Sequence, residues 1–229
     1  MRKLLLSTTV AAVMASVSFA GQAAESASLS VSGTIAPSSC DVSLSSATID
    51  LGSINAGTLT ADLNVKPVSD VTVNVDCGAP AGVAVQTTDN RAASAMTLAD
   101  ISEQMKTDLN GFTDAHLFGL GTDSEQGKIG TLVMAVSAAT ADGSANANLL
   151  TSSDKAAWTA TTLSASSVQP VEKNSYFTLA NDANSTAPAA MTKSTYTLMS
   201  QLMLKKANLY PAGEEVKLDG NVTFSVVYL

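Results

Sequence analysis

The chain has 229 residues, which suits one domain or at most two small ones and is long enough to bury a core without help from disulfides. Its 20 acidic residues outnumber 12 basic ones, for a net charge of -8, so nucleic acid is excluded as a partner because phosphate binding needs a basic surface. One His and two Cys are too few for a zinc finger, an iron–sulfur cluster or a multi-histidine metal site. We therefore predict no metal and no cofactor.

The N-terminus has the three parts of an export signal. Arg2 and Lys3 form a basic start, residues 4–19 carry no charge, and small residues at Ser18 and Ala20 fit cleavage after Ala20 or a few residues later. The apolar run is short for a membrane span. We predict a signal peptide over residues 1–20, export through the Sec pathway into the periplasm, and an acidic mature protein.

Export changes what the two cysteines predict. Cys40 and Cys77 would both meet an oxidising compartment, where a disulfide is the expected state and two free buried thiols the alternative. On the chain-entropy model, closing a loop of this length stabilises the fold by roughly 4 kcal/mol.

Several segments alternate apolar and polar residues with a period of two, which is typical of half-buried strands. The clearest are residues 23–35, 68–77 and 216–229. Gly78-Ala79-Pro80 predicts a turn, with residues 82–87 returning as a hairpin partner of 68–77. A shorter strand is predicted over Ala47–Leu51, and further short strands lie between residues 116 and 204. Many short strands separated by turns favour an all-β sandwich.

One stretch breaks this rhythm. Over Thr97–Asn110 the apolar residues recur at helical spacing, and Thr97 with Asp100 resembles a capping box. This pattern predicts a short helix inside a loop insertion, with a disordered loop as the alternative.

Both ends of the mature chain resemble a known family. An alternating first strand is followed by Gly33-Thr-Ile-Ala-Pro-Ser-Ser-Cys40, a second Cys closes a Val-rich strand, and the last strand has a penultimate Tyr228. These features resemble subunits of chaperone–usher pili, and more closely the β-fimbria-like (P-pilus-like) branch of proteobacterial secreted proteins of unknown function. The shared short motifs, in chain order, are Asp89-Asn90-Arg91, Phe118-Gly-Leu-Gly121, Lys128-Ile129-Gly130, Ala141-Asp142-Gly143 and Leu218-Asp219-Gly220.

The resemblance implies an immunoglobulin-like, pilin-type sandwich that lacks its last strand. A periplasmic chaperone covers the exposed groove until, at the outer-membrane usher, the N-terminal strand of the next subunit replaces it. The resemblance thus implies a structural subunit of a surface fimbrium that supports adhesion, with other subunits as head-to-tail partners and a host or surface receptor as a further partner.

The same resemblance assigns residues to roles. Residues 21–32 would form an N-terminal donor strand, with Ala27, Leu29 and Val31 facing a neighbour's groove, and residues 33–229 would form the pilin-like domain. The edge of the groove, which the chaperone would also bind, is assigned to four alternating residues of the last strand: Val222, Phe224, Val226 and Tyr228.

Two other functions are weighed against this one. The first and last strands could pair within one chain, giving a self-complemented monomeric β-sandwich that acts as an adhesin-like binding module. An enzyme is disfavoured, because no Gly-x-Ser-x-Gly elbow surrounds any serine and His116 stands alone. We therefore predict no catalytic residue.

Overall fold

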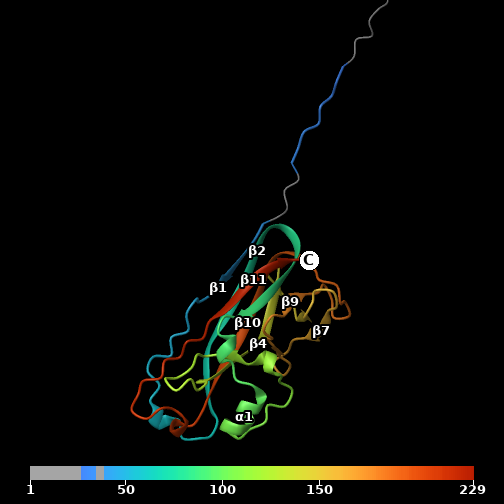
Figure 1. The fold of residues 1–229 in the computed structure, drawn as a ribbon. Coiled ribbons are helices and arrows are strands. Elements are labelled where there is room, and N and C mark those ends of the chain that lie inside the picture. Colours follow the sequence, from blue (N-terminus) through green and yellow to red (C-terminus); the bar gives the residue numbers. More distant parts are fainter. Residues whose placement is uncertain (1–26, 35–38) are drawn as a thin grey trace, which may run out of the picture. The chain divides into compact units, whose positions relative to one another are not determined.

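A computed structural model describes residues 27–34 and 39–229, so the predicted signal peptide and its cleavage site lie outside the described residues. The described chain is an all-β sandwich with one α-helix, as predicted (Figure 1). None of its described helices has the length and hydrophobicity that a bilayer span requires. The strands are β1 (Cys40–Leu44), β2 (Asn64–Asp89), β3 (Phe118–Gly119), β4 (Gly130–Ala141), β5 (Ser144–Ala145), β6 (Asn148–Ser152), β7 (Thr159–Thr162), β8 (Gln169–Pro170), β9 (Tyr176–Leu179), β10 (Ala190–Leu204) and β11 (Val222–Tyr228). The helix is α1 (Leu98–Met105), and short 3-10 turns are η1 (Ala56–Thr58), η2 (Ala92–Ser94), η3 (Asp114–His116) and η4 (Ala207–Leu209).

The strands form one antiparallel network that curls into two layers. In the first layer the N-terminal half of β2 pairs with β1 on one side and β10 on the other, and β10 pairs with β4. In the second layer the C-terminal half of β2 pairs with β11 and β9, and β6 and β7 continue the sheet. The long strand β2 therefore belongs to both layers.

The predicted hairpin after Gly78 is wrong. Gly82 is still paired with β10, and Val83 is the first residue paired with β11, so residues 82–87 enter the other layer. Figure 1 shows β2 curling over at this point. The bend follows Gly78-Ala79-Pro80, but the partners on each side come from β10 and β11, which are distant in sequence.

The main core fills the space between the two layers. It joins Val73 and Tyr196 of the first layer to Val85 and Phe177 of the second, all at most 2% exposed. The rings of Phe177 and Tyr196 meet edge to face with centroids 4.8 Å apart. This aromatic pair therefore joins the two layers directly.

Helix α1 covers the outer face of the first layer. Successive strand residues point to opposite faces, and Met134 lies in the main core, whereas Val133 packs with Ile101 and Met105 of the helix. The predicted capping box of Thr97 is present, so the helical expectation is confirmed. The helix ends at Met105, short of the predicted residue 110, because Lys106 adopts a left-handed conformation with φ 52°.

Three predicted strand segments differ in the structure. Residues 27–34 form no strand and are fully exposed, because no described strand pairs with them and an unpaired strand is not stable in water. The rest of the predicted first strand lies outside the described residues. Residues 47–51 are irregular, and β11 begins at Val222 rather than at residue 216.

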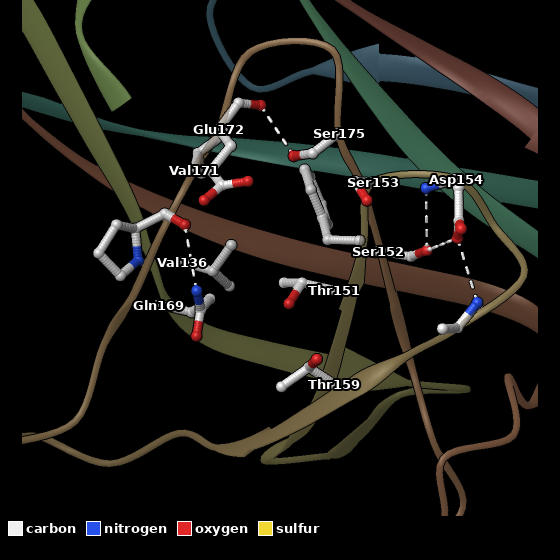
Figure 2. Close-up of a pocket in the computed structure, with 13 residues that line it drawn as sticks. Val136, Thr151, Ser152, Ser153, Asp154, Thr159, Gln169, Val171, Glu172 and Ser175 are labelled. Atoms are coloured by element: carbon white, nitrogen blue, oxygen red, sulfur yellow. Dashed lines mark hydrogen bonds between the residues drawn. The ribbon is translucent and has the colours of Figure 1, made fainter. Parts of the chain in front are cut away.

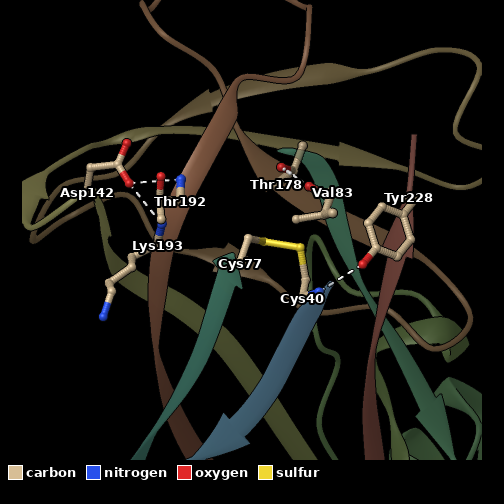
Figure 3. The surroundings of a disulfide bond; sticks show 8 residues. All are labelled: Cys40, Cys77, Val83, Asp142, Thr178, Thr192, Lys193 and Tyr228. Carbon is tan, nitrogen blue, oxygen red and sulfur yellow. Dashed lines mark hydrogen bonds between the residues drawn. A yellow bond between two sulfur atoms is a disulfide. The ribbon is translucent and has the colours of Figure 1, made fainter. Parts of the chain in front are cut away.

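The expected disulfide joins Cys40 of β1 to Cys77 of β2, which face each other directly in the strand register (Figure 3). It therefore ties the edge strand β1 to the strand that spans both layers.

Replacing both cysteines by alanine should lower the free energy of unfolding by about 4 kcal/mol, because the 37-residue separation sets the entropy of the closed loop. Urea denaturation of the variant and of the oxidised protein measures this difference, and the reduced wild-type protein is the matched control. Equal stability of oxidised and reduced protein would contradict the prediction.

Acid should weaken the attachment of α1 through Asp100. Burial acts to raise the pKa of this carboxyl, but hydrogen bonds from Lys128, at 2.8 Å, and from Thr97 outweigh it and hold the pKa below its ordinary value of 3.8. A depressed folded-state pKa contributes stability above the unfolded value, and this contribution is lost as the pH falls through the folded value. Asp100→Asn should therefore cost about 1 kcal/mol at neutral pH and progressively less below pH 4. Urea denaturation of both proteins across that range tests the trend, which a constant difference would refute.

Candidate functional site

Two edge strands from different layers lie next to each other, and neither has a second partner strand among the described residues. Within the described chain, β1 pairs only with residues 73–77 of β2, and β11 pairs only with residues 83–89 of the same strand. The two edges meet at one end, where the Cys40 backbone N–H donates a 2.8 Å hydrogen bond to the Tyr228 hydroxyl (Figure 3). Each strand thus presents one edge without ladder hydrogen bonds in the described part of the molecule.

An apolar groove of about 380 Å³ opens between these edges. One wall is formed by the end of β1 and the irregular residues 46–51, and the other by residues 218–224. The floor is formed by residues of the main core and by Leu198, Ser200 and Leu202 of β10. The apolar side chains of the groove are Leu44, Ala47, Ile49, Leu51, Val68, Val71, Leu120, Leu132, Met134, Leu198, Leu202, Leu218, Val222 and Phe224.

The residues predicted for the groove edge divide into two groups. Val222 and Phe224 line the groove, and together with Val226 they are half-buried against the main core. Val226 and Tyr228 lie outside the groove, toward the disulfide end of the strand, and Tyr228 is 51% exposed. Half-buried apolar rows are typical of a sheet edge whose inner face is not fully covered.

Sequence reasoning missed the opposite wall. Val42 and Leu44 of β1 are half-buried and pack against the main core, and Leu44 lines the groove. The alternation Cys40, Val42, Leu44 was the available signal. The family resemblance assigns only the first and last segments of the mature chain to the groove, so it does not point to β1.

The predicted donor residues lie in the segment 27–34. Leu29 and Val31 are each 91% exposed, and Ala27 is exposed as well. Within the single chain these alternating apolar side chains are not buried.

Three of the short motifs converge at one end of the groove, and we call this cluster the corner. The Gly119 N–H donates to the Asp89 carboxylate at 2.9 Å, and the Asp219 N–H donates to the Leu120 carbonyl at 2.9 Å. The Arg91 guanidinium donates to both oxygens of Asp219, at 2.8 and 3.0 Å. The corner therefore joins the end of β2, the chain around β3 and the approach to β11.

An ion pair and several amide hydrogen bonds hold the chain in place where β11 begins. The hydrogen bond from Arg91 lowers the pKa of Asp219, so this exposed pair stays charged at neutral pH. Asn90 follows the last residue of β2, and its backbone N–H donates to the Asn221 carbonyl at 2.9 Å. Its side-chain amide donates to the Thr223 hydroxyl at 2.7 Å. These contacts hold one wall of the groove in place.

His116, the residue considered for catalysis, is buried rather than placed at the groove. Its Nδ1 accepts from the Thr113 N–H at 2.8 Å, and its Nε2 lies 3.3 Å from a Glu172 carboxylate oxygen. This arrangement ties two loops together. The described residues contain no group of three or more His, Cys, Asp or Glu placed to hold a metal ion.

Gly119→Ala should disrupt the corner, because an added Cβ would lie 2.1 Å from the Arg91 carbonyl oxygen and 2.6 Å from the Ser94 hydroxyl. The expected loss of unfolding free energy is roughly 1–3 kcal/mol. Gly82→Ala is the matched control, since nothing lies within 4 Å of its Cβ, and it should change stability by less than about 0.5 kcal/mol. Equal effects of the two substitutions in urea denaturation would show that close packing at Gly119 is unimportant.

Comparison with known proteins places the chain among bacterial relatives. The family described as "Protein of unknown function (DUF1120)" matches residues 29–133. Protein GltF of Escherichia coli (strain K12) is 30% identical over 178 residues, covering 69% of this chain and 68% of that protein. The uncharacterized protein YhcF of the same organism is 27% identical over 226 residues, covering 91% of this chain and 92% of that protein. No solved structure is significantly similar to the chain. The match to residues in β1, β2, α1 and the corner, together with the relationship to GltF, shows that this chain belongs to the DUF1120 family.

Proposed function

We propose that this protein is a structural subunit of a surface fimbrium, in which the groove between β1 and β11 receives the N-terminal strand of another copy. The observation that carries the proposal is the pair of neighbouring edge strands, each without a second partner strand in the described chain, on either side of an apolar groove.

A strand inserted in this groove would complete the sheet on both sides. Its backbone would form ladder hydrogen bonds with β1, β11 or both, and every second side chain would enter the apolar floor. The same edges left open are templates for uncontrolled pairing with other chains. A subunit with these open edges therefore needs another protein to shield them before assembly, and we assign this role to a periplasmic chaperone.

The chemistry of the N-terminal segment supports its role as the inserted strand. Leu29 and Val31 are two positions apart and both 91% exposed, whereas Ser28 and Ser30 between them are polar. In an extended strand the two apolar side chains face the same way. Burying each of them in the groove of a neighbour would contribute roughly 1.5–3 kcal/mol.

Insertion of one copy into the next generates an open, head-to-tail polymer, because the donor and the acceptor surfaces are different parts of the chain. The proposal further places the protein in the periplasm during transit and then at the cell surface, exported by the signal sequence and assembled at an outer-membrane usher. Its role would be structural and adhesive, with no catalytic activity.

The double substitution Leu29→Asp and Val31→Asp should abolish assembly, because charged side chains cannot enter an apolar groove without a large desolvation cost. The matched control is Ser28→Asp with Ser30→Asp, which adds the same charge to the opposite face. Light scattering coupled to size-exclusion chromatography of the mature proteins should show oligomers for the wild type and the control, and monomers for the Leu29/Val31 variant.

The same measurements separate the alternatives. A wild-type monomer whose melting temperature falls in the Leu29/Val31 variant would show that the segment fills the groove of its own chain, as in a self-complemented binding module. A wild-type monomer whose stability does not depend on these two residues would show that the groove needs no strand at all. Either result would overturn the fimbrial proposal.

A further inference from the structure

A second cleft has a volume of about 350 Å³. Figure 2 shows residues that line it. Its walls come from β4 and β8 in one layer and from β6, β7 and β9 in the other. In the strand order, β1 and β11 lie at one margin of the two layers, whereas β8 and β7 lie at the opposite margin. The second cleft is therefore separate from the groove in which assembly is proposed.

Hydrogen-bonding side chains surround the second cleft from several directions. Figure 2 shows Glu172 and Gln169 on one side, Ser153 and Asp154 on the other, and the hydroxyls of the β6 and β7 threonines between them. The polar side chains that line it are those of Thr151, Ser152, Ser153, Asp154, Thr159, Gln169, Glu172 and Ser175. Most of these groups are hydroxyls or carboxylates, which accept hydrogen bonds.

The charges in this lining are of one sign. Among the described residues that line it, Asp154 and Glu172 are the only ionisable side chains, and none is a lysine or an arginine. The N–H groups of Ala157 and Ala156 and the Ser152 hydroxyl all lower the pKa of Asp154, which keeps it ionised at neutral pH. A ligand with phosphate, sulfate or carboxylate groups would be repelled.

The two carboxylates are held apart on separate loops. Asp154 accepts the N–H of Ala156 at 2.8 Å within the turn between β6 and β7. Glu172, in the connection between β8 and β9, lies 3.3 Å from His116 Nε2 through one oxygen. Hydroxyls lie between them, so the hydrogen-bond acceptors are spread round the opening. A metal ion or a single ammonium group would need these acceptors gathered at one point.

The remaining lining is apolar: Pro170 is half-buried and Ala157 is exposed, whereas Val136, Val171 and Phe177 are buried core residues beneath the opening. Small-molecule sites combine such apolar surface with a few placed polar groups, and the cleft volume falls in their usual range. A ligand suited to it has several hydroxyl donors, carbon–hydrogen faces and no negative charge.

We propose that the cleft between β8 and the β6–β7 hairpin binds a neutral saccharide, with Asp154 and Glu172 accepting hydrogen bonds from its hydroxyls. This inference does not depend on strand insertion, because the cleft and the groove share no lining residue. A saccharide could thus occupy the cleft whether the protein is a monomer or part of a fibre.

The test is ligand-observed NMR of the mature full-length protein with a panel of neutral mono- and disaccharides at millimolar concentrations, and with spermidine as a cationic probe. We expect saturable binding of at least one saccharide. Glu172→Gln and Asp154→Asn should each weaken it by about tenfold, since hydrogen bonds to charged acceptors are the strong ones. Thr159→Val, on the exposed strand β7, should weaken it too without altering the turn.

Glu103→Gln is the matched control, because it removes an exposed carboxylate on α1, away from the cleft, and should leave binding unchanged. Thermal melting of every variant verifies that it is folded. Failure of all the saccharides to bind, binding of spermidine alone, or saccharide binding that survives the Glu172, Asp154 and Thr159 substitutions would each overturn the proposal.

Discussion

The structure depends on the pairing of one long strand with four others. β2 is the partner of both β1 and β11, and it also carries β10 and β9 on its opposite side. Because β2 passes from one layer to the other, it brings two edge strands from different layers next to each other. The groove between them is thus a consequence of how β2 bends, and it exists because no described strand fills the remaining position.

The corner explains why the groove keeps its shape without a strand inside it. An isolated edge strand such as β11, with one ladder of hydrogen bonds, would be free to move at its start. Asp89, Arg91 and Asp219 prevent this, since they link the end of β2 to the chain that enters β11 and to the backbone at Gly119. In the proposed assembly, a groove held in this way would reduce the ordering cost of binding a strand.

Much of this fold is readable from the sequence, and the missing parts have physical reasons. The alternation in β11, the capping box at Thr97 and the pair Cys40 and Cys77 are local signals, and the structure contains all three elements. The bend of β2 cannot be predicted from the local sequence, because residues 82–87 have the same alternation whether they pair with 68–77 or with β11. The short motifs of the corner are visible in the sequence. That they form a packed junction follows only from the fold, which brings Gly119 and Asp89 into contact. The second cleft could not be predicted, since it combines residues from five strands and the turns that connect them.

The position of the disulfide also has a mechanical meaning. Cys40 is the first residue of β1, so it is the point at which the polypeptide leaving the N-terminal segment enters the sandwich. A pulling force applied through that segment would reach Cys77, and with it the central strand, through covalent bonds. The hydrogen bonds of β1 would be bypassed, and the strand could not be peeled from its leading end. Such a force would act on the pairing of β2 with its neighbours and not on that of β1 alone.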